Sequence, residues 1–346
     1  MAQTGKFRVG VSHDFSIEAK GHYEAALAQV LGSQPHIEVE LMPPFEGEGP
    51  SREQMEAYDG ILALAIQLDS PRIDGLGRLA IVARWGVGYD RIDTGALTRN
   101  GIVLSITPNA VRRPVAEAAI GLIFATSLNL MRQHKIVEAA RWREALPGLG
   151  RNIAGRTLGS IGLGNIAGEM FRMAASLGFG RLLAHDPYAS PEQARALNVE
   201  LVSLEDLVRQ SDFLCVHCSL SPGTRGLVNR ELLRLMRPTA ILINTARGPI
   251  VNEADLVEAL REGWIAGAGL DVFEVEPLPA GAAIRECPNV IFAPHSLAWT
   301  EELARDNTIE ACTSLLAVSR GQLPTGIVNR QVLDNPLFQG KLSRYK

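Results

Sequence analysis

An excess of positive charge is missing from this chain of 346 residues, whose formal net charge is −4. A basic surface neutralises phosphate backbones and anionic lipid, so its absence argues against nucleic-acid and membrane binding. The first ten residues, MAQTGKFRVG, lack the uninterrupted apolar segment of a secretory signal. Internal repeats and low-complexity tracts are also missing. We therefore expect a cytoplasmic globular protein.

Long hydrophobic runs are scarce, and the longest candidate covers residues 115–131, VAEAAIGLIFATSLNLM. A membrane helix is one interpretation, but Glu117, Ser127 and Asn129 interrupt the run. A helix that is apolar nearly all round is more typical of one buried on every side. Packing against a second copy of the chain achieves such burial, so we expect a homodimer.

Cysteine is rare, with four in the chain, and Cys215 and Cys218 form a CxxC motif. This motif can indicate a redox or metal site. Here it lies in FLCVHCSL, which is typical of a buried strand, and residues three apart on a strand point to opposite faces. We expect two buried thiols and propose no metal, because the histidines outside the site described below lack ligand spacing. His217 lies in the same strand pattern and is interpreted as structural.

The composition, 46% hydrophobic and 21% charged, is that of a globular protein with room for two domains. Apolar runs alternate with helical patterns, which predicts α/β layers with parallel sheets. The first series of strands is expected at 7–11, 37–41, 61–66, 79–85 and 102–106. A second series of six is expected at 157–162, 181–185, 213–218, 240–244, 268–271 and 290–293, and a further helix at 301–320.

The second series opens with a nucleotide-binding fingerprint, GLGNIA, at residues 162–167. In this GxGxxA pattern Gly162 permits a tight turn, and Gly164 lets backbone N–H groups approach a pyrophosphate. Asn165 and Ile166 then begin a helix whose N-terminus faces the phosphate charge. The pattern predicts dinucleotide binding.

Asp186 strengthens this prediction because it ends the next apolar run, RLLAHD, 22 residues after Gly164. A carboxylate at this position accepts hydrogen bonds from an adenosine ribose. It also repels a 2′-phosphate, so we expect NAD rather than NADP.

Three later strands end in residues that carry chemistry, and ligands bind at the carboxyl ends of such strands. His295 is the candidate proton donor and acceptor for hydride transfer at an alcohol carbon, because its unperturbed pKa suits neutral pH. Glu276 is the nearest candidate to hold its ring. The planar fork of Arg247 suits a substrate carboxylate.

The composite pattern resembles the D-isomer-specific 2-hydroxyacid dehydrogenase family. The resemblance is carried by GLGNIA, HCSLSPGTRGLVN, NTARGPIVNEADLVEAL, GLDVFEVEPLP and APHSLAWT, and upstream by ARWGVGYDRID and PVAEAAIGL. That family includes phosphoglycerate dehydrogenases, hydroxypyruvate and glyoxylate reductases, D-lactate dehydrogenases and the C-terminal-binding corepressors. The resemblance spans most of the chain.

The resemblance implies an NAD-dependent enzyme acting on a small D-2-hydroxy or 2-keto acid. His295 and Glu276 would form the proton relay, and Arg247 would hold the substrate carboxylate and carbonyl. The backbone of Val87 and Gly88 would hold the other end of the carboxylate. The remaining residues that we assign to the cofactor are Ser219, Thr224, Thr245, Ala246 and Asp271.

It also implies two doubly wound α/β domains, with a Rossmann NAD-binding domain, residues 110–298, inserted into a flavodoxin-like substrate-binding domain, residues 1–109 and 299–346. Relatives are commonly homodimers joined through the cofactor domain. Two further functions stay open on the same scaffold. One is an NAD(H)-sensing binding protein of the corepressor type, and the other is a phosphite-type dehydrogenase.

Several positions depart from the family pattern. Ser219 replaces the proline of the HxPL segment, and Arg112 and Arg113 add positive charge at the start of the long apolar helix. Those arginines either recognise a second anionic group or belong to the solvated surface. Trp299, four residues after His295, either lines the substrate pocket or belongs to the domain junction.

Overall fold

The structure is a computed structural model that describes residues 5–287 and 289–345. It divides into two compact units, which are described separately. Unit 1 contains Met1–Val111 and Trp299–Lys346, and unit 2 contains Arg112–Ala298. Both are α/β layers built on a parallel sheet, so the predicted fold class of two doubly wound domains is confirmed.

Unit 1 is built on a five-stranded sheet in the order β2-β1-β3-β4-β5. This is the flavodoxin-like order. The strands are β1 (Phe7–Val11), β2 (Ile37–Leu41), β3 (Gly60–Ala63), β4 (Ile81–Arg84) and β5 (Val103–Ser105). Their covering helices are α1 (Glu24–Leu31), α2 (Arg52–Met55), α3 (Ser70–Ile73), α4 (Thr94–Arg99), α12 (Glu301–Ser319) and α13 (Pro336–Ser343).

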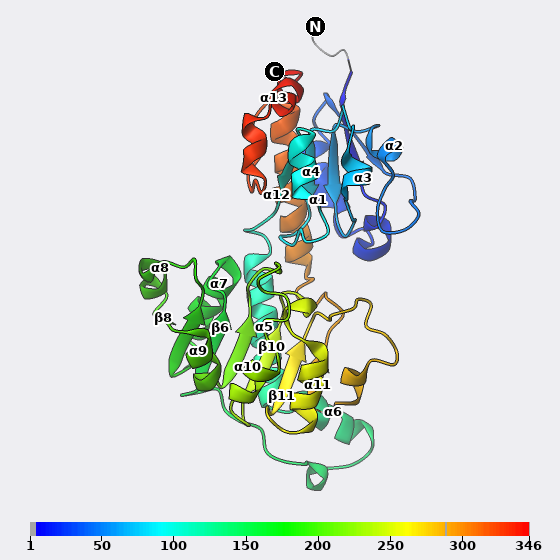
Figure 1. The fold of residues 1–346 in the computed structure, drawn as a ribbon. Helices are drawn as coiled ribbons and strands as arrows, with labels where there is room; N and C mark the ends of the chain where they lie inside the picture. The colour runs from blue at the N-terminus through cyan, green and yellow to red at the C-terminus, as the bar shows by residue number, and fades with distance from the viewer. Residues whose placement is uncertain (1–4, 288, 346) are drawn as a thin grey trace. The chain divides into compact units, whose positions relative to one another are not determined.

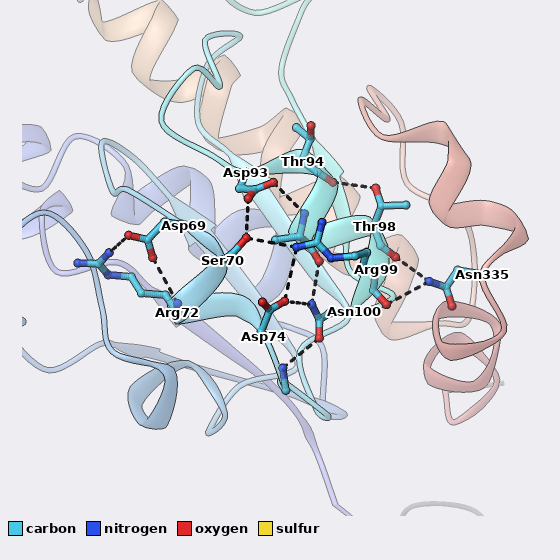
Figure 2. Close-up of polar contacts among 12 residues, drawn as sticks. Asp69, Ser70, Arg72, Asp74, Asp93, Thr94, Thr98, Arg99, Asn100 and Asn335 are labelled. Atoms are coloured by element: carbon cyan, nitrogen blue, oxygen red, sulfur yellow. Dashed lines mark hydrogen bonds and ion pairs between the residues drawn. The ribbon is translucent and has the colours of Figure 1, made fainter.

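The C-terminal part of unit 1 is tied to its N-terminal part by buried polar groups. Lys341 is buried, and its ammonium donates to the carbonyl oxygens of Leu76 at 3.1 Å, Leu79 at 2.7 Å and Asn100 at 2.7 Å. The amide of Asn335 donates to the carbonyl of Thr98 at 2.6 Å (Figure 2). The last helix is therefore an integral part of this unit.

Asp93, which closes the ARWGVGYDRID motif, has a structural role in unit 1. Its carboxylate accepts the backbone N–H of Ala96 at 2.8 Å, which caps α4, and the hydroxyl of Ser70 at 2.7 Å (Figure 2). An aspartate at this position satisfies a helix N–H that has no partner within the helix. These bonds lower the pKa of Asp93, so the cap is ionised at neutral pH.

Unit 2 is built on a seven-stranded sheet in the order β12-β11-β10-β9-β6-β7-β8. Its strands are β6 (Thr157–Ile161), β7 (Arg181–His185), β8 (Glu200–Leu201), β9 (Phe213–Val216), β10 (Ile241–Asn244), β11 (Gly267–Leu270) and β12 (Val290–Phe292). Its helices are α5 (Arg112–Ser127), α6 (Leu130–Glu138), α7 (Asn165–Ala174), α8 (Pro191–Ala196), α9 (Leu204–Gln210), α10 (Arg230–Leu235) and α11 (Glu253–Arg261). Figure 1 shows α9, α10 and α11 in front of the strands and α5 behind them.

The helix expected at 115–131 is two helices. It ends at Ser127, and α6 begins after Asn129, whose φ is +55°. The hydroxyls of Thr126 and Ser127 donate back to carbonyls of the preceding turn, and asparagine tolerates the left-handed conformation that follows. No single helix among the described residues is long and apolar enough to span a membrane, and α5 and α6 meet at a 59° bend.

The CxxC residues lie on opposite faces of the unit 2 sheet, as predicted. Cys215 belongs to the core beneath α5 and α7, whereas Cys218 packs against the core beneath α10 and α11. Both thiols are free, and burial raises the pKa of each, that of Cys218 to about 11. Such thiols are unreactive at neutral pH.

Candidate active site

The fingerprint glycines form the turn between β6 and α7. Gly162 has φ +98°, and a side chain there would lie 2.8 Å from the backbone nitrogen of Cys218, so the position requires glycine. Gly164 differs, because a Cβ added to it would meet no atom within 4 Å. The chain itself therefore does not require glycine at 164, and the open space above it fits the close approach of a ligand.

The N-terminus of α7 faces this space without a cap from the protein. Gly164 is the N-cap residue and provides no side-chain hydrogen bond, and the first turn holds no acidic residue. The backbone N–H groups of Asn165 and Ile166 are among those left without an intrahelical acceptor. Together with the helix dipole they suit a phosphate group.

Asp186 follows β7 beside the glycine turn. One carboxylate oxygen accepts the N–H of Leu163 at 2.8 Å, and the other accepts the N–H of Tyr188 at 2.8 Å. The fold thus brings this carboxylate next to Gly162 and Gly164. The backbone bonds were not expected from the sequence, and they fix the orientation of the carboxylate.

Ser160 and His217 are hydrogen-bonded to each other, and Ser160 also binds the glycine turn. The sequence predicted only that His217 is structural. The Ser160 hydroxyl donates to the carbonyl of Gly162 at 2.7 Å, so it accepts from Nδ1 of His217 at 3.1 Å. Nε2 of His217 is buried and has no partner among the described residues. The expected structural histidine is therefore satisfied at one ring nitrogen only, and burial lowers its pKa to about 4.

This buried histidine predicts acid sensitivity. The unfolded chain protonates His217 near pH 6.5 and the folded chain only near pH 4, so its contribution to stability is complete above pH 6.5 and is lost as pH falls towards 4. When the pH falls from 7 to 5, the free energy of unfolding should decrease in both proteins. The decrease should be about 2 kcal/mol smaller in His217→Gln than in the wild type. Urea titrations at both pH values measure this, with exposed His22→Gln as control. Equal losses in the wild type and His217→Gln would contradict the prediction.

His295 and Glu276 form a pair at the carboxyl edge of the sheet, after β12 and β11. Nδ1 of His295 lies 2.8 Å from one carboxylate oxygen of Glu276, and the other accepts the N–H of Phe273 at 2.9 Å. Burial alone would raise the pKa of Glu276. The hydrogen bond and charge of His295 outweigh it, and the pKa is lowered. Glu276 is therefore a carboxylate that orients the imidazole.

Asp271 holds the loop that carries His295. Its carbonyl accepts the N–H of His295 at 2.7 Å, and its buried carboxylate accepts those of Ser296 and Leu297, each at 3.1 Å. His295 itself has φ +55°, which is uncommon for a residue with a side chain. These bonds maintain that backbone conformation. Our assignment of Asp271 to the cofactor remains a prediction.

Arg247 follows β10, which is the strand next to β11. Its guanidinium donates to the carbonyl of Ala246 at 2.7 Å, and Asn244 accepts the N–H of Ala246 and donates to the carbonyl of Arg247. The charge of Arg247 also contributes to lowering the pKa of Glu276. The fold thus gathers the predicted arginine, glutamate and histidine. The hydroxyl oxygen of Thr245 is buried and has no partner among the described residues.

Ser219 and Thr224 lie in the loop after β9. The Thr224 hydroxyl donates to the carbonyl of Ser219 at 2.7 Å and accepts the N–H of Ser221 at 2.8 Å. The two residues are therefore neighbours, and Ser219 takes part through its backbone carbonyl rather than its side chain. With the glycine turn, the uncapped helix and the Thr245 hydroxyl, this edge of unit 2 fits a dinucleotide.

The structure gives the contacts of three residues whose roles the sequence left open. Arg113 pairs with Glu117 at 2.7 Å, and Arg112 lies 3.6 Å from Glu169, so both arginines bind carboxylates of unit 2. Trp299 packs edge-to-face on Trp85 of unit 1, with ring centroids 5.5 Å apart. Trp85 immediately precedes Gly86, so Trp299 lies near the segment that contains Val87 and Gly88.

Comparisons with known proteins agree with this geometry. The model of the D-isomer specific 2-hydroxyacid dehydrogenase NAD-binding domain matches residues 120–296. A glyoxylate reductase from Korarchaeum cryptofilum is 34% identical over 309 residues, covering 87% of this chain and 92% of that protein. Another from Thermococcus onnurineus is 37% identical over 290 residues, covering 82% and 86%.

Solved structures give the same result. A glyoxylate reductase from Paecilomyes thermophila superposes with a TM-score of 0.80 at 25% identity, covering 95% of this chain and all of that one. A protein from Thermus thermophilus gives 0.81 at 30% identity, covering 93% and 99%. The matched domain is an NAD-binding domain, so NAD is the cofactor, as predicted. The protein belongs to the D-isomer-specific 2-hydroxyacid dehydrogenase family.

Proposed function

We propose that this NAD-dependent 2-hydroxyacid dehydrogenase reduces a small 2-keto acid to the D-2-hydroxy acid, with His295 and Glu276 as the proton relay. The observation that carries the proposal is the 2.8 Å pair of these two side chains beside Arg247. Glyoxylate is the first substrate to test, because the curated relatives named above are glyoxylate reductases.

When bound, the NADH cofactor would supply the hydride for the carbonyl carbon. His295 donates a proton from Nε2 to the carbonyl oxygen, so that the keto acid, a hydride and a proton give the hydroxy acid. Glu276 accepts the hydrogen bond from Nδ1 and stabilises the protonated ring before transfer. In the reverse direction the neutral ring accepts the hydroxyl proton.

Arg247 binds the substrate carboxylate and carbonyl oxygen through its planar fork. The backbone N–H groups of Val87 and Gly88 bind the other end of the carboxylate. Unit 1 accordingly has the substrate-binding role, and unit 2 has the cofactor-binding role. The negative charge of a carboxylate is complementary to one guanidinium and two N–H donors.

The glycine turn and the first residues of α7 would hold the pyrophosphate of NAD, and Asp186 would bind the adenosine ribose. Residues that follow β9, β10 and β11 would hold the nicotinamide end. These residues are Ser219, Thr224, Thr245, Ala246 and Asp271. The buried unpartnered hydroxyl of Thr245 supports its place in this set.

Asp186 predicts the choice between the two cofactors. Because its carboxylate also accepts the N–H groups of Leu163 and Tyr188, Asp186→Ala changes the turn as well as the charge. Asp186→Asn removes the charge and keeps an acceptor oxygen. In both variants the ratio of kcat/KM with NADH to that with NADPH should fall by roughly 10-fold or more, from lost charged hydrogen bonds. Steady-state kinetics measures this, and an unchanged ratio removes Asp186 from the ribose site.

We also propose a homodimer formed through α5 and α6. None of the residues of α6 is buried, and the exposed large apolar side chains of this region include Phe124, Leu128, Leu130, Met131 and Val137. Apolar patches of this kind mark association surfaces. Sedimentation equilibrium should give twice the monomer mass, and a monomer at micromolar concentration would contradict the proposal.

The direct test is NADH oxidation at 340 nm by the purified full chain with glyoxylate, hydroxypyruvate, pyruvate, phenylpyruvate and 3-phosphohydroxypyruvate. Turnover of one or more of these acids supports the proposal. A chain that binds NADH tightly without turning over any of them counts against it and favours the NAD(H)-sensing alternative. Phosphite with NAD tests the remaining alternative.

A further inference from the structure

The segment Trp85–Gly86–Val87–Gly88 follows β4 in unit 1 and is held on one side by Arg84, the last residue of that strand. Nε of Arg84 donates to the carbonyl of Gly88 at 3.0 Å, and Nη1 donates to the carbonyl of Trp85. One guanidinium therefore binds the first and last carbonyls of the segment.

Thr107, which is 1% exposed, holds the segment at its centre. Its hydroxyl accepts the N–H of Gly86 at 2.8 Å, and its own N–H donates to the carbonyl of Gly86 at 3.1 Å. The same hydroxyl bonds the buried Asn307 of α12 at 2.5 Å. Gly86 has φ +130°, and an added Cβ would lie 3.3 Å from the Arg84 guanidinium, so glycine is needed here.

This arrangement determines where the next N–H groups point. The carbonyl and the N–H of a trans peptide point in opposite directions, so Val87 N–H points away from Thr107, which binds the carbonyl of Gly86. Within residues 5–287 and 289–345, no protein acceptor is found for the N–H of Val87 or of Gly88. Both residues are only half-buried. Two adjacent donors are thus available to a ligand.

We infer that Arg84 is a positioning residue, which presents the N–H groups of Val87 and Gly88 to a substrate carboxylate by holding the two ends of their segment. The inference rests on the proposed function, because that function assigns the carboxylate to these donors. Lysine should not replace Arg84, since its ammonium lacks the planar spacing by which Nε and Nη1 reach the carbonyls of Gly88 and Trp85.

The test compares Arg84→Ala and Arg84→Lys with Arg91→Ala, a control arginine in the same unit that pairs with Glu48. We expect the KM for the 2-keto acid to rise by about 10- to 100-fold in both Arg84 variants, as misplaced binding groups do. The KM for NADH should stay within twofold and kcat should change less than KM. Added guanidinium should restore the KM of Arg84→Ala, whereas equal sodium chloride should not.

Oxalate binding to each protein–NADH complex, measured by calorimetry, separates this inference from the proposed function. If the wild type binds oxalate but reduces no 2-keto acid, the proposed function fails and the oxalate Kd of the variants still decides the role of Arg84. Unchanged oxalate affinity in Arg84→Ala overturns the inference. So does a loss of affinity that guanidinium does not recover. A wild type that neither binds oxalate nor reduces a keto acid overturns both.

Discussion

His295→Ala should lower kcat for keto-acid reduction by a factor on the order of 10² to 10⁴, which is the usual contribution of a positioned acid–base group. The carbonyl oxygen then lacks a proton donor at the moment that it acquires negative charge. Affinity for NADH should be nearly unchanged, because the residues that we propose for the pyrophosphate and ribose precede β9 and are not altered. Single-turnover absorbance at 340 nm and NADH titration measure the two effects separately.

His22→Ala is the matched control, since His22 is exposed and belongs to unit 1, far in sequence from His295. It should retain wild-type kinetics. A second variant, Glu276→Gln, keeps a hydrogen-bond acceptor for Nδ1 but removes the charge that stabilises the protonated ring. Near-normal turnover in His295→Ala would remove this histidine from the proton relay.

Arg247→Lys should lower kcat/KM for the keto acid by a factor on the order of 10² to 10³, which corresponds to the loss of one partner in a buried charged pair. The variant keeps the positive charge that helps to lower the pKa of Glu276, so it isolates the loss of the planar fork. The same measurement with NADH varied should show little change.

Arg261→Lys provides the control, because Arg261 is a surface residue of the same unit paired with Glu286 at 2.8 Å. Exposed pairs of this kind contribute little. If kcat/KM of Arg247→Lys stays within threefold of the wild type, then Arg247 does not hold the carboxylate. In that case, the two N–H donors of Val87 and Gly88 become the principal binding groups.

The sheets were largely predictable because buried parallel strands form short apolar runs. β1, β2 and β7 begin and end at the predicted residues, and the other predicted strands differ at their ends. The structure adds one strand, β8, which the sequence did not indicate. Glu200 and Leu201 are both exposed, so no apolar run marks it. The break in the long helix was missed, because Asn129 ends α5 through backbone conformation rather than hydropathy.

That Arg247, Glu276 and His295 lie together was predictable, because they follow consecutive strands of one parallel sheet. Their supports were not predictable. The carboxylate of Asp271 binds backbone 25 residues away, and Ser160 binds His217 across two strands. Such bonds depend on which strands are neighbours, and β6 lies next to β9 only because the chain doubles back. Arg84 was not predicted either, since the two carbonyls that it binds belong to the residues that directly follow it.

The division of unit 1 into two segments constrains the order in which the chain matures during synthesis. The strands of unit 1 leave the ribosome first, but α12, which packs on α1, β3 and β4, follows the whole of unit 2. Trp85 and Thr107 bond Thr308 and Asn307 of that late helix. The segment Trp85–Gly88 therefore acquires its final contacts only after the whole of unit 2 has been translated, so a chain still on the ribosome completes this part of unit 1 last.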